Sequence, residues 1–159
     1  MPSGETRSMH VGPAHPLDTD AVMALCEQLH QESVYRSLPF DRRKVADYIS
    51  RVTLDPANRC LFVARIAGHA RGMLAGYLDE YVFCDGRVAY DTVFYVEKRQ
   101  RGSLMAKLLI TAFRDWAADR GAREVCLGVS SGINNDRVGR FYESLGFTCV
   151  GALYKQRLR

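Results

Sequence analysis

The sequence has no long apolar stretch. No apolar run comes near the roughly 20 residues that a helix needs to cross a bilayer. Residues 1–15 also lack the hydrophobic core of a secretory signal. We therefore expect a cytoplasmic protein that makes no contact with a membrane.

Cysteine pairs and metal-ligand patterns are missing as well. The five cysteines are widely spaced and include no C-x-x-C pair, so we expect free, mostly buried thiols. The four histidines have no spacing typical of metal ligands. The sequence therefore predicts neither a structural nor a catalytic metal.

The positive charge is small and dispersed. The chain has 22 Lys and Arg against 18 Asp and Glu, a formal net charge of +4. This dispersed charge does not predict a nucleic-acid partner. A local cluster of Lys98, Arg99 and Arg101 is the exception, and it leaves a small RNA- or DNA-binding regulator as an alternative.

Repeats, low-complexity segments and long linkers are also absent from the sequence. A chain of 159 residues with 47% hydrophobic residues can build one well-packed core and is too short for two ordinary domains. We expect a single domain over residues 1–159, in which residues 1–8 form a disordered lead.

Helical periodicity is clearest over residues 103–120. Apolar residues recur there every three or four positions, and Gly121 follows as a C-terminal stop. Further helices are expected to begin near Asp18, near Asp41 and at Asn134-Asn135, where side chains can cap a helix.

β-prone runs bounded by turn residues predict the strands. They occupy residues 8–13, 60–66, 71–83, 87–96, 124–129 and 147–158, the last as one strand or a pair. Their order among the helices is β-α-α-β-β-β-α-β-α-β. This order predicts an α/β fold with a mixed sheet of about six or seven strands and helices on both faces.

The segment 96–106 is the first functional candidate. A strand that ends at Val96 passes through a basic, glycine-containing turn directly into the helix. A helix N-terminus presents free backbone N–H groups that favour phosphate, and Arg101 adds a side chain that can bind it. A basic surface turn without a ligand would have the same pattern, so both interpretations stay open.

Two motifs resemble those of the GNAT superfamily of acyl-CoA-dependent N-acyltransferases. The first resembles that family's Gln/Arg-x-x-Gly-x-Gly/Ala turn, with Arg101 at its first position and Ala106 at its last. Leu104 stands where the family has its middle glycine. The second runs from Asn135 to the Phe-Tyr-Glu-x-x-Gly-Phe ending over 141–147.

The resemblance implies an acetyl-CoA site without a metal. The pantetheine would lie along the end of a central strand, and the pyrophosphate would meet the turn and the start of the following helix. Asn135 would either contact the cosubstrate or simply cap its helix. The implied binding residues are Phe94, Tyr95, Val96, Arg101, Gly102, Ser103, Leu104, Met105, Ala106 and Asn135.

The resemblance also implies direct transfer of an acetyl group to a primary amine of a small molecule or peptide, in a protein that could be a homodimer. Tyr142 stands at the family's general-acid position, and it could equally be a core aromatic residue. Asp91, Glu97 and Glu80 are acidic residues on or next to the central strands, of which Asp91 and Glu97 are our candidates for a base. Leu104 leaves a degenerate domain, which binds acyl-CoA or a partner without catalysis, as the main alternative.

Overall fold

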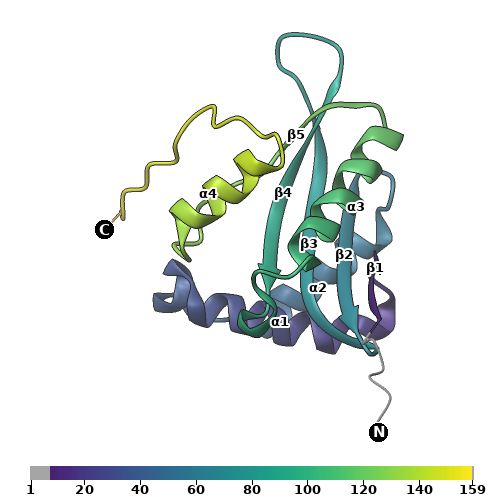
Figure 1. Cartoon of the computed structure of the whole chain (residues 1–159), viewed down its shortest axis with the longest axis vertical. Helices are drawn as coiled ribbons and strands as arrows, with labels where there is room; N and C mark the ends of the chain where they lie inside the picture. The colour runs from purple at the N-terminus through teal and green to yellow at the C-terminus, as the bar shows by residue number, and fades with distance from the viewer. Residues whose placement is uncertain (1–7, 159) are drawn as a thin grey trace, which may run out of the picture.

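The computed structural model describes residues 8–158 (Figure 1). The expected disordered lead, residues 1–8, lies outside the described residues except for Ser8. Two short 3-10 turns concern the site, namely η2 Val34–Ser37 and η3 Lys98–Gln100. The strands are β1 Met9–Pro13, β2 Arg59–Ile66, β3 His69–Glu80, β4 Arg87–Val96 and β5 Ala122–Cys126, and the α-helices are α1 Thr19–Glu32, α2 Arg42–Leu54, α3 Met105–Asp119 and α4 Asn135–Ser144.

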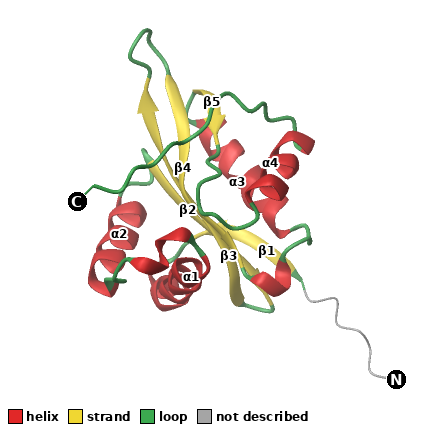
Figure 2. Ribbon diagram, turned by 90° about the vertical axis from the view of Figure 1, so that its left-hand side faces the viewer, coloured by secondary structure: helices red, strands yellow, loops and turns green. Residues whose placement is uncertain are grey.

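The strands form one mixed sheet in the order β1-β2-β3-β4-β5. All neighbouring strands are antiparallel except β4 and β5, which are parallel. Helices α1 and α2 lie on one face of the sheet, and α3 and α4 lie on the other (Figure 2). The expected mixed α/β sheet with helices on both faces is confirmed.

The expected number of strands was too high. The described chain has five strands, and residues 147–158 contain neither strand nor helix. Their apolar side chains are largely uncovered, with Val150 94% and Tyr154 91% exposed. A β-prone sequence becomes a strand only where a neighbouring strand takes up its backbone hydrogen bonds, and composition does not specify that neighbour.

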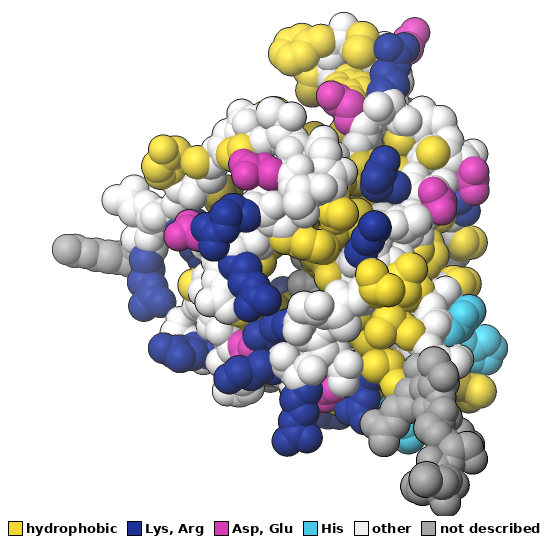
Figure 3. Space-filling view, viewed as in Figure 1, with side chains coloured by type: hydrophobic (Ala, Val, Ile, Leu, Met, Phe, Trp, Pro, Cys, Tyr) yellow, Lys and Arg dark blue, Asp and Glu magenta, His cyan; other side chains and the backbone are white. Residues whose placement is uncertain are grey.

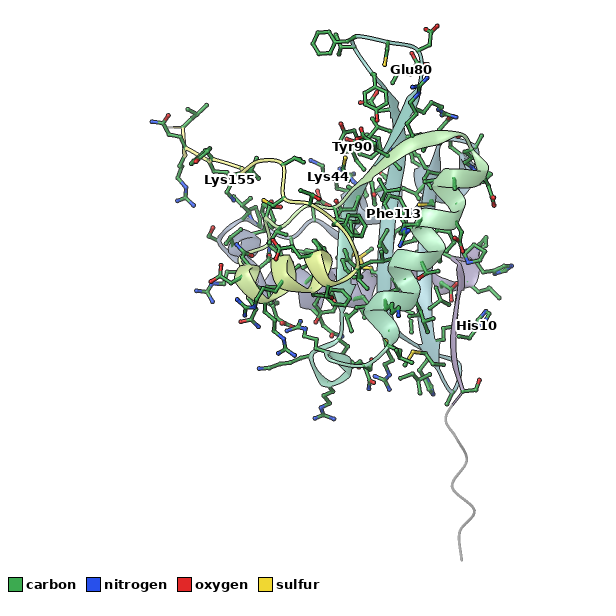
Figure 4. All side chains as sticks on the ribbon, turned by 45° about the horizontal axis from the view of Figure 1, so that its top comes forward. His10, Lys44, Glu80, Tyr90, Phe113 and Lys155 are labelled. Carbon is green, nitrogen blue, oxygen red and sulfur yellow. The ribbon has the colours of Figure 1, made fainter. Side chains whose placement is uncertain are left out.

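The core has one layer on each side of the sheet. Met105, Leu109 and Phe113 of α3 are fully buried against one face, and apolar residues of α1 and α2 cover the other. Phe113, labelled in Figure 4, packs so close to β3 that a Cβ on Gly76 would lie 2.5 Å from its Cε2 atom. Burial of each such side chain contributes about 1.5–3 kcal/mol, which fixes α3 and its N-terminus on the sheet.

The cysteines differ from the expectation. All five are free thiols, but only Cys60 is buried, so the prediction of mostly buried thiols is wrong. Cys84 lies between β3 and β4 and Cys149 lies after α4, two places where no element covers the chain. In the described part of the chain, no helix is both long enough and apolar enough to cross a membrane.

Candidate functional site

The site begins where β4 and β5 separate. β5 pairs only with residues 87–90 of β4, and it ends at Cys126, three residues before its expected end. From Asp91 to Val96, β4 still pairs with β3 but has no partner on its other side among the described residues. The opening between the two strands belongs to a cleft of about 460 Å³.

A β-bulge lies at the point of separation. Val93 pairs with Ala75 and Asp91 pairs with Gly76, so Thr92 is an extra residue without a partner on β3. A bulge turns the neighbouring side chains and bends the strand. Here the Asp91 carboxylate bridges the opening, and the Gly128 N–H donates a hydrogen bond of 2.8 Å to its Oδ1.

Asp91 is placed to be protonated and deprotonated near neutral pH. Burial raises the pKa of this carboxyl group from 3.8 to about 6, although hydrogen bonds from the amides of Gly128 and Asp91 itself oppose the rise. No Lys, Arg or His within residues 8–158 makes an ion pair with it. An unpaired carboxylate of this kind can accept a proton from a bound amine.

Tyr142 faces the same cleft from α4. Its ring is only 6% exposed and stacks on Phe94, with a centroid distance of 6.4 Å. Its hydroxyl donates a long hydrogen bond of 3.5 Å to the carbonyl oxygen of Gly128. Burial raises the pKa of Tyr142 above 10.0, and the negative charge of Asp91 raises it further. Tyr142 is therefore both a core aromatic and a polar group at the cleft.

The turn before α3 leaves backbone donors free. Within residues 8–158, the N–H groups of Gly102, Leu104, Ala106 and Lys107 donate to no protein oxygen. Gly102 has a φ of +87°, which a residue with a Cβ adopts only with strain. The free N–H groups and the start of the α3 dipole favour an anion here.

Leu104, at the position of the family's middle glycine, does not block the turn. Its φ of −66° and ψ of −10° are ordinary helical values, which need no glycine. Its side chain is 65% exposed, and it does not line the cleft. Its N–H group therefore stays available although its side chain is large.

Arg101 points away from the free N–H groups, toward α1. Its Nη2 donates to Glu32 Oε2 at 2.6 Å, its Nε donates to the carbonyl oxygen of Val96 at 3.0 Å, and its guanidinium lies 5.4 Å from the Tyr95 ring centroid. The Tyr95 hydroxyl also donates to Glu32, at 2.5 Å. Burial raises the pKa of Glu32, but the hydrogen bonds from Tyr95 and Arg101 outweigh it and leave the pKa below 4.5.

Most of the expected site residues meet at the cleft, and some do not. The lining includes Asp91, Phe94, Tyr95, Val96, Arg101, Gly102, Ser103, Ala106 and Tyr142. Met105 is buried in the core, and neither Leu104 nor Asn135 lines the cleft. Glu97 lies outside it and pairs with Arg71 at 3.2 Å, and Glu80 lies near the outer end of the β3–β4 hairpin (Figure 4).

Several lining residues were not singled out from the sequence. Gly128 lies in the chain between β5 and α4. Tyr35 of η2, which also lines the cleft, lies in the segment between the first two helices that the family resemblance connects with acceptor specificity. Arg137 of α4 also lines the cleft, and its Nη2 lies 3.7 Å from the position of a Cβ on Gly102. Lys and Arg side chains gather along a hollow beside α4 (Figure 3). Only one sequence signal could have pointed to Arg137 as a cleft residue. It is an arginine in the first turn of a helix that begins after an asparagine cap.

The described residues contain no group of three or more His, Cys, Asp or Glu side chains arranged to hold a metal ion.

The cleft thus combines free N–H donors, a basic rim, a separation between parallel strands and one unpaired carboxylate. The model of the Acetyltransferase (GNAT) family matches residues 22–147. The chain belongs to the GNAT family. The family inferred from the sequence is thereby confirmed.

Solved structures agree on the fold at low sequence identity. A transcriptional regulator from Bacillus halodurans C-125 is 18% identical, with a TM-score of 0.79, over 95% of this chain and 100% of that one. The acetyltransferase AAC(6′)-Iy, bound to a CoA-containing bisubstrate analogue, is 21% identical, with a TM-score of 0.77, over 96% and 99%. Glucosamine-6-phosphate N-acetyltransferase from Arabidopsis thaliana is 15% identical, with a TM-score of 0.75, over 96% and 99%. No curated protein sequence matches significantly.

Proposed function

We propose that this GNAT protein transfers an acetyl group from acetyl-CoA directly to a primary amine. The observation that carries the proposal is the unpaired, largely buried carboxylate of Asp91, which lies in the cleft between β4 and β5. The cleft reaches from this carboxylate to the turn before α3, where phosphate can bind. Two of the similar structures are named as acetyltransferases of amine-bearing compounds, which supports an amine acceptor.

The turn suits the pyrophosphate of acetyl-CoA. The free N–H groups of Gly102, Leu104 and Ala106 would bind it, with Arg137 close enough to add charge. The pantetheine would then follow the open edge of β4 from Val96 toward the bulge, where unpaired backbone groups can bind its amides. This path brings the thioester toward Asp91.

Asp91 would act as the general base. It takes a proton from the acceptor ammonium, directly or through a water, and leaves a neutral amine. The amine nitrogen attacks the thioester carbonyl carbon, a C–N bond forms and the C–S bond breaks. The CoA thiolate leaves and must gain a proton, and the nitrogen must lose its second proton to become an amide. That proton restores the group that protonated the thiolate.

Tyr142 would supply the proton to the thiolate. Its raised pKa keeps it protonated before the reaction, but it also makes the hydroxyl a poor donor to a thiolate. Part of the rise comes from the negative charge of Asp91. When Asp91 takes up the amine proton, this charge disappears and the pKa of Tyr142 falls. The two proton transfers would therefore support each other.

A degenerate domain that binds without catalysis is the main alternative, and it rested on Leu104. The ordinary backbone angles and exposed side chain of Leu104 remove that argument. The two functions give different results in two measurements on the purified protein. Acetyl-CoA binding by calorimetry tests the site, and amine-dependent release of CoA thiol tests catalysis. Binding without release for a broad set of amines would favour the degenerate domain, and absence of binding would refute both.

A further inference from the structure

We propose that the acceptor amine also carries an anionic group, a phosphate or a carboxylate, and that Lys155 and Arg157 bind this group beside Tyr35. The inference rests on the proposed acetyl transfer and specifies its substrate class. It follows from the charges at the end of the cleft that faces α1 and η2.

Helix α1 and η2 form the acceptor end of the cleft. The turn that suits the pyrophosphate leads into α3, on one face of the sheet, while Leu29 and Tyr35 line the cleft from the side of α1 and α2. The Val34 N–H donates to the carbonyl oxygen of Ser131 at 2.9 Å and so fixes η2 against the chain that follows β5. An amine that approaches Asp91 opposite the cosubstrate therefore passes Tyr35.

The C-terminal segment places two cations at this end. It runs past α4, clear of the sheet (Figure 1), and its end lies toward the side of α1 and α2 (Figure 2). Lys155 Nζ lies 4.8 Å from the centroid of the Tyr35 ring, and Arg157 Nη2 donates to Ser37 Oγ at 3.4 Å. Lys155 is labelled on this segment in Figure 4. Both side chains thus contact η2 through neutral groups, which leave their charges unbalanced.

No carboxylate of the described residues balances these charges. Within residues 8–158, neither Lys155 nor Arg157 has a carboxylate oxygen within 4.0 Å, and Arg36 beside them has none either. Glu32, the acidic residue at the end of α1, is already paired with Arg101. An anionic group on the acceptor would offset the excess positive charge.

The acidic side of the cleft points to a single ammonium group. Asp91 is the one acidic residue that lines the cleft in the described structure, where it stands with Arg101 and Arg137. A polycation would find one carboxylate and several cations, whose repulsion disfavours binding. A molecule with one ammonium group and one anionic group would match Asp91 with the first and Lys155 and Arg157 with the second.

Matched pairs of amines test the proposal. One pair is glucosamine and glucosamine 6-phosphate, and the other is propylamine and β-alanine, so that the members of each pair differ in the anionic group. Calorimetry on the CoA-saturated protein, or on the free protein if CoA does not bind, should give about fivefold tighter binding of the anionic member in at least one pair. This preference should decrease as salt is added, because both cations are exposed to solvent.

Charge-removing variants locate the site. Lys155→Gln combined with Arg157→Gln should abolish the preference and leave the affinity for the neutral member unchanged. Arg51→Gln, which removes an exposed charge from α2 away from η2, should keep the preference. The proposal is overturned if neither anionic member binds more tightly than its neutral partner, or if the double variant keeps the full preference. Failure of acetyl transfer is recognised separately, by the absence of CoA thiol release while the binding preference persists.

Discussion

Asp91 and Tyr142 bind the two polar groups of the same residue, Gly128. Its N–H donates to Asp91 Oδ1 at 2.8 Å, and its carbonyl oxygen accepts from the Tyr142 hydroxyl at 3.5 Å. Residues from β4 and α4 are thereby held around the chain that leaves β5. This arrangement places the proposed base and the proposed acid on one short stretch of backbone.

Replacement of Asp91 by Asn should remove the base without changing the size of the side chain. We expect kcat/KM to fall about 10²- to 10⁴-fold, the usual contribution of general-base catalysis. The affinity for acetyl-CoA should stay nearly unchanged, since no carboxylate is needed to bind it. Steady-state kinetics and calorimetry measure the two quantities. The control is Asp115→Asn on the exposed face of α3, and a loss of activity in both variants would contradict a specific role.

The pH dependence should follow Asp91. Its pKa of about 6 means that the carboxylate is mostly protonated, and inactive as a base, at lower pH. We therefore expect the pH profile of kcat/KM to have an acidic limb. In this limb kcat/KM rises through about pH 6 with the slope of a single deprotonation. The residual activity of Asp91→Asn should lack this limb. A profile that has the same acidic limb in both proteins would assign the limb to another group.

The same carboxyl group should destabilise the fold near neutral pH. Because the pKa is raised by folding, its contribution to stability is fully present below about pH 3.8 and is lost as pH rises through about 6. A change from 3.8 to about 6 corresponds to about 3 kcal/mol, an upper value for a group that retains some contact with solvent. Asp91→Asn should therefore unfold at higher urea concentration than the parent protein at about pH 8, and the difference should vanish near pH 3. An Asn that destabilises the protein at both pH values would contradict the raised pKa.

Much of the fold follows from periodic patterns in the sequence. The helix 105–119 and the strand 87–96 were predicted almost to the residue, because their apolar periodicity agrees with their burial. The C-terminal strand was not formed, since pairing depends on a neighbour that no local pattern specifies. The same limit applies to the site. Asp91 was a candidate from its strand, but the bulge at Thr92 and the partner Gly128 depend on pairing across the sheet and could not be predicted.

Tyr142→Phe should distinguish the contribution of the hydroxyl group from that of the aromatic ring. The ring packing stays, and the lost hydrogen bond is long, so the stability should fall by less than about 1 kcal/mol. If Tyr142 is the acid, kcat should fall about 10²-fold while acetyl-CoA affinity changes little. Tyr77→Phe is the matched control, because that tyrosine packs against the Tyr90 ring outside the cleft. An unchanged kcat for Tyr142→Phe would leave Tyr142 as a core residue only.

Glu32→Gln and Arg101→Ala should shift acetyl-CoA affinity in opposite directions. Glu32 holds and neutralises Arg101 at the edge of the cleft, so its replacement frees the Arg101 side chain to turn toward the expected phosphates. We expect binding about threefold tighter for Glu32→Gln and weaker by a similar factor for Arg101→Ala. Glu27 lies on α1 like Glu32, and Glu27→Gln breaks its exposed pair with Arg42 of α2. This variant serves as the control and should have no effect. If both cleft variants left the affinity unchanged, the charge of Arg101 would have no part in cosubstrate binding.

Leu104→Gly tests whether the missing glycine of the first motif matters. The leucine has helical backbone angles and an exposed side chain, so removal of the side chain opens no new space in the cleft. We expect the acetyl-CoA dissociation constant to change less than about twofold, the variation typical of a surface substitution. Thermal unfolding should show a loss of up to about 1 kcal/mol, because glycine increases the entropy of the unfolded chain. A tenfold gain in affinity would instead mean that Leu104 obstructs the phosphate turn, and it would restore the argument for a degenerate domain. Calorimetry on the single variant therefore decides between a natural variation of the motif and a closed site.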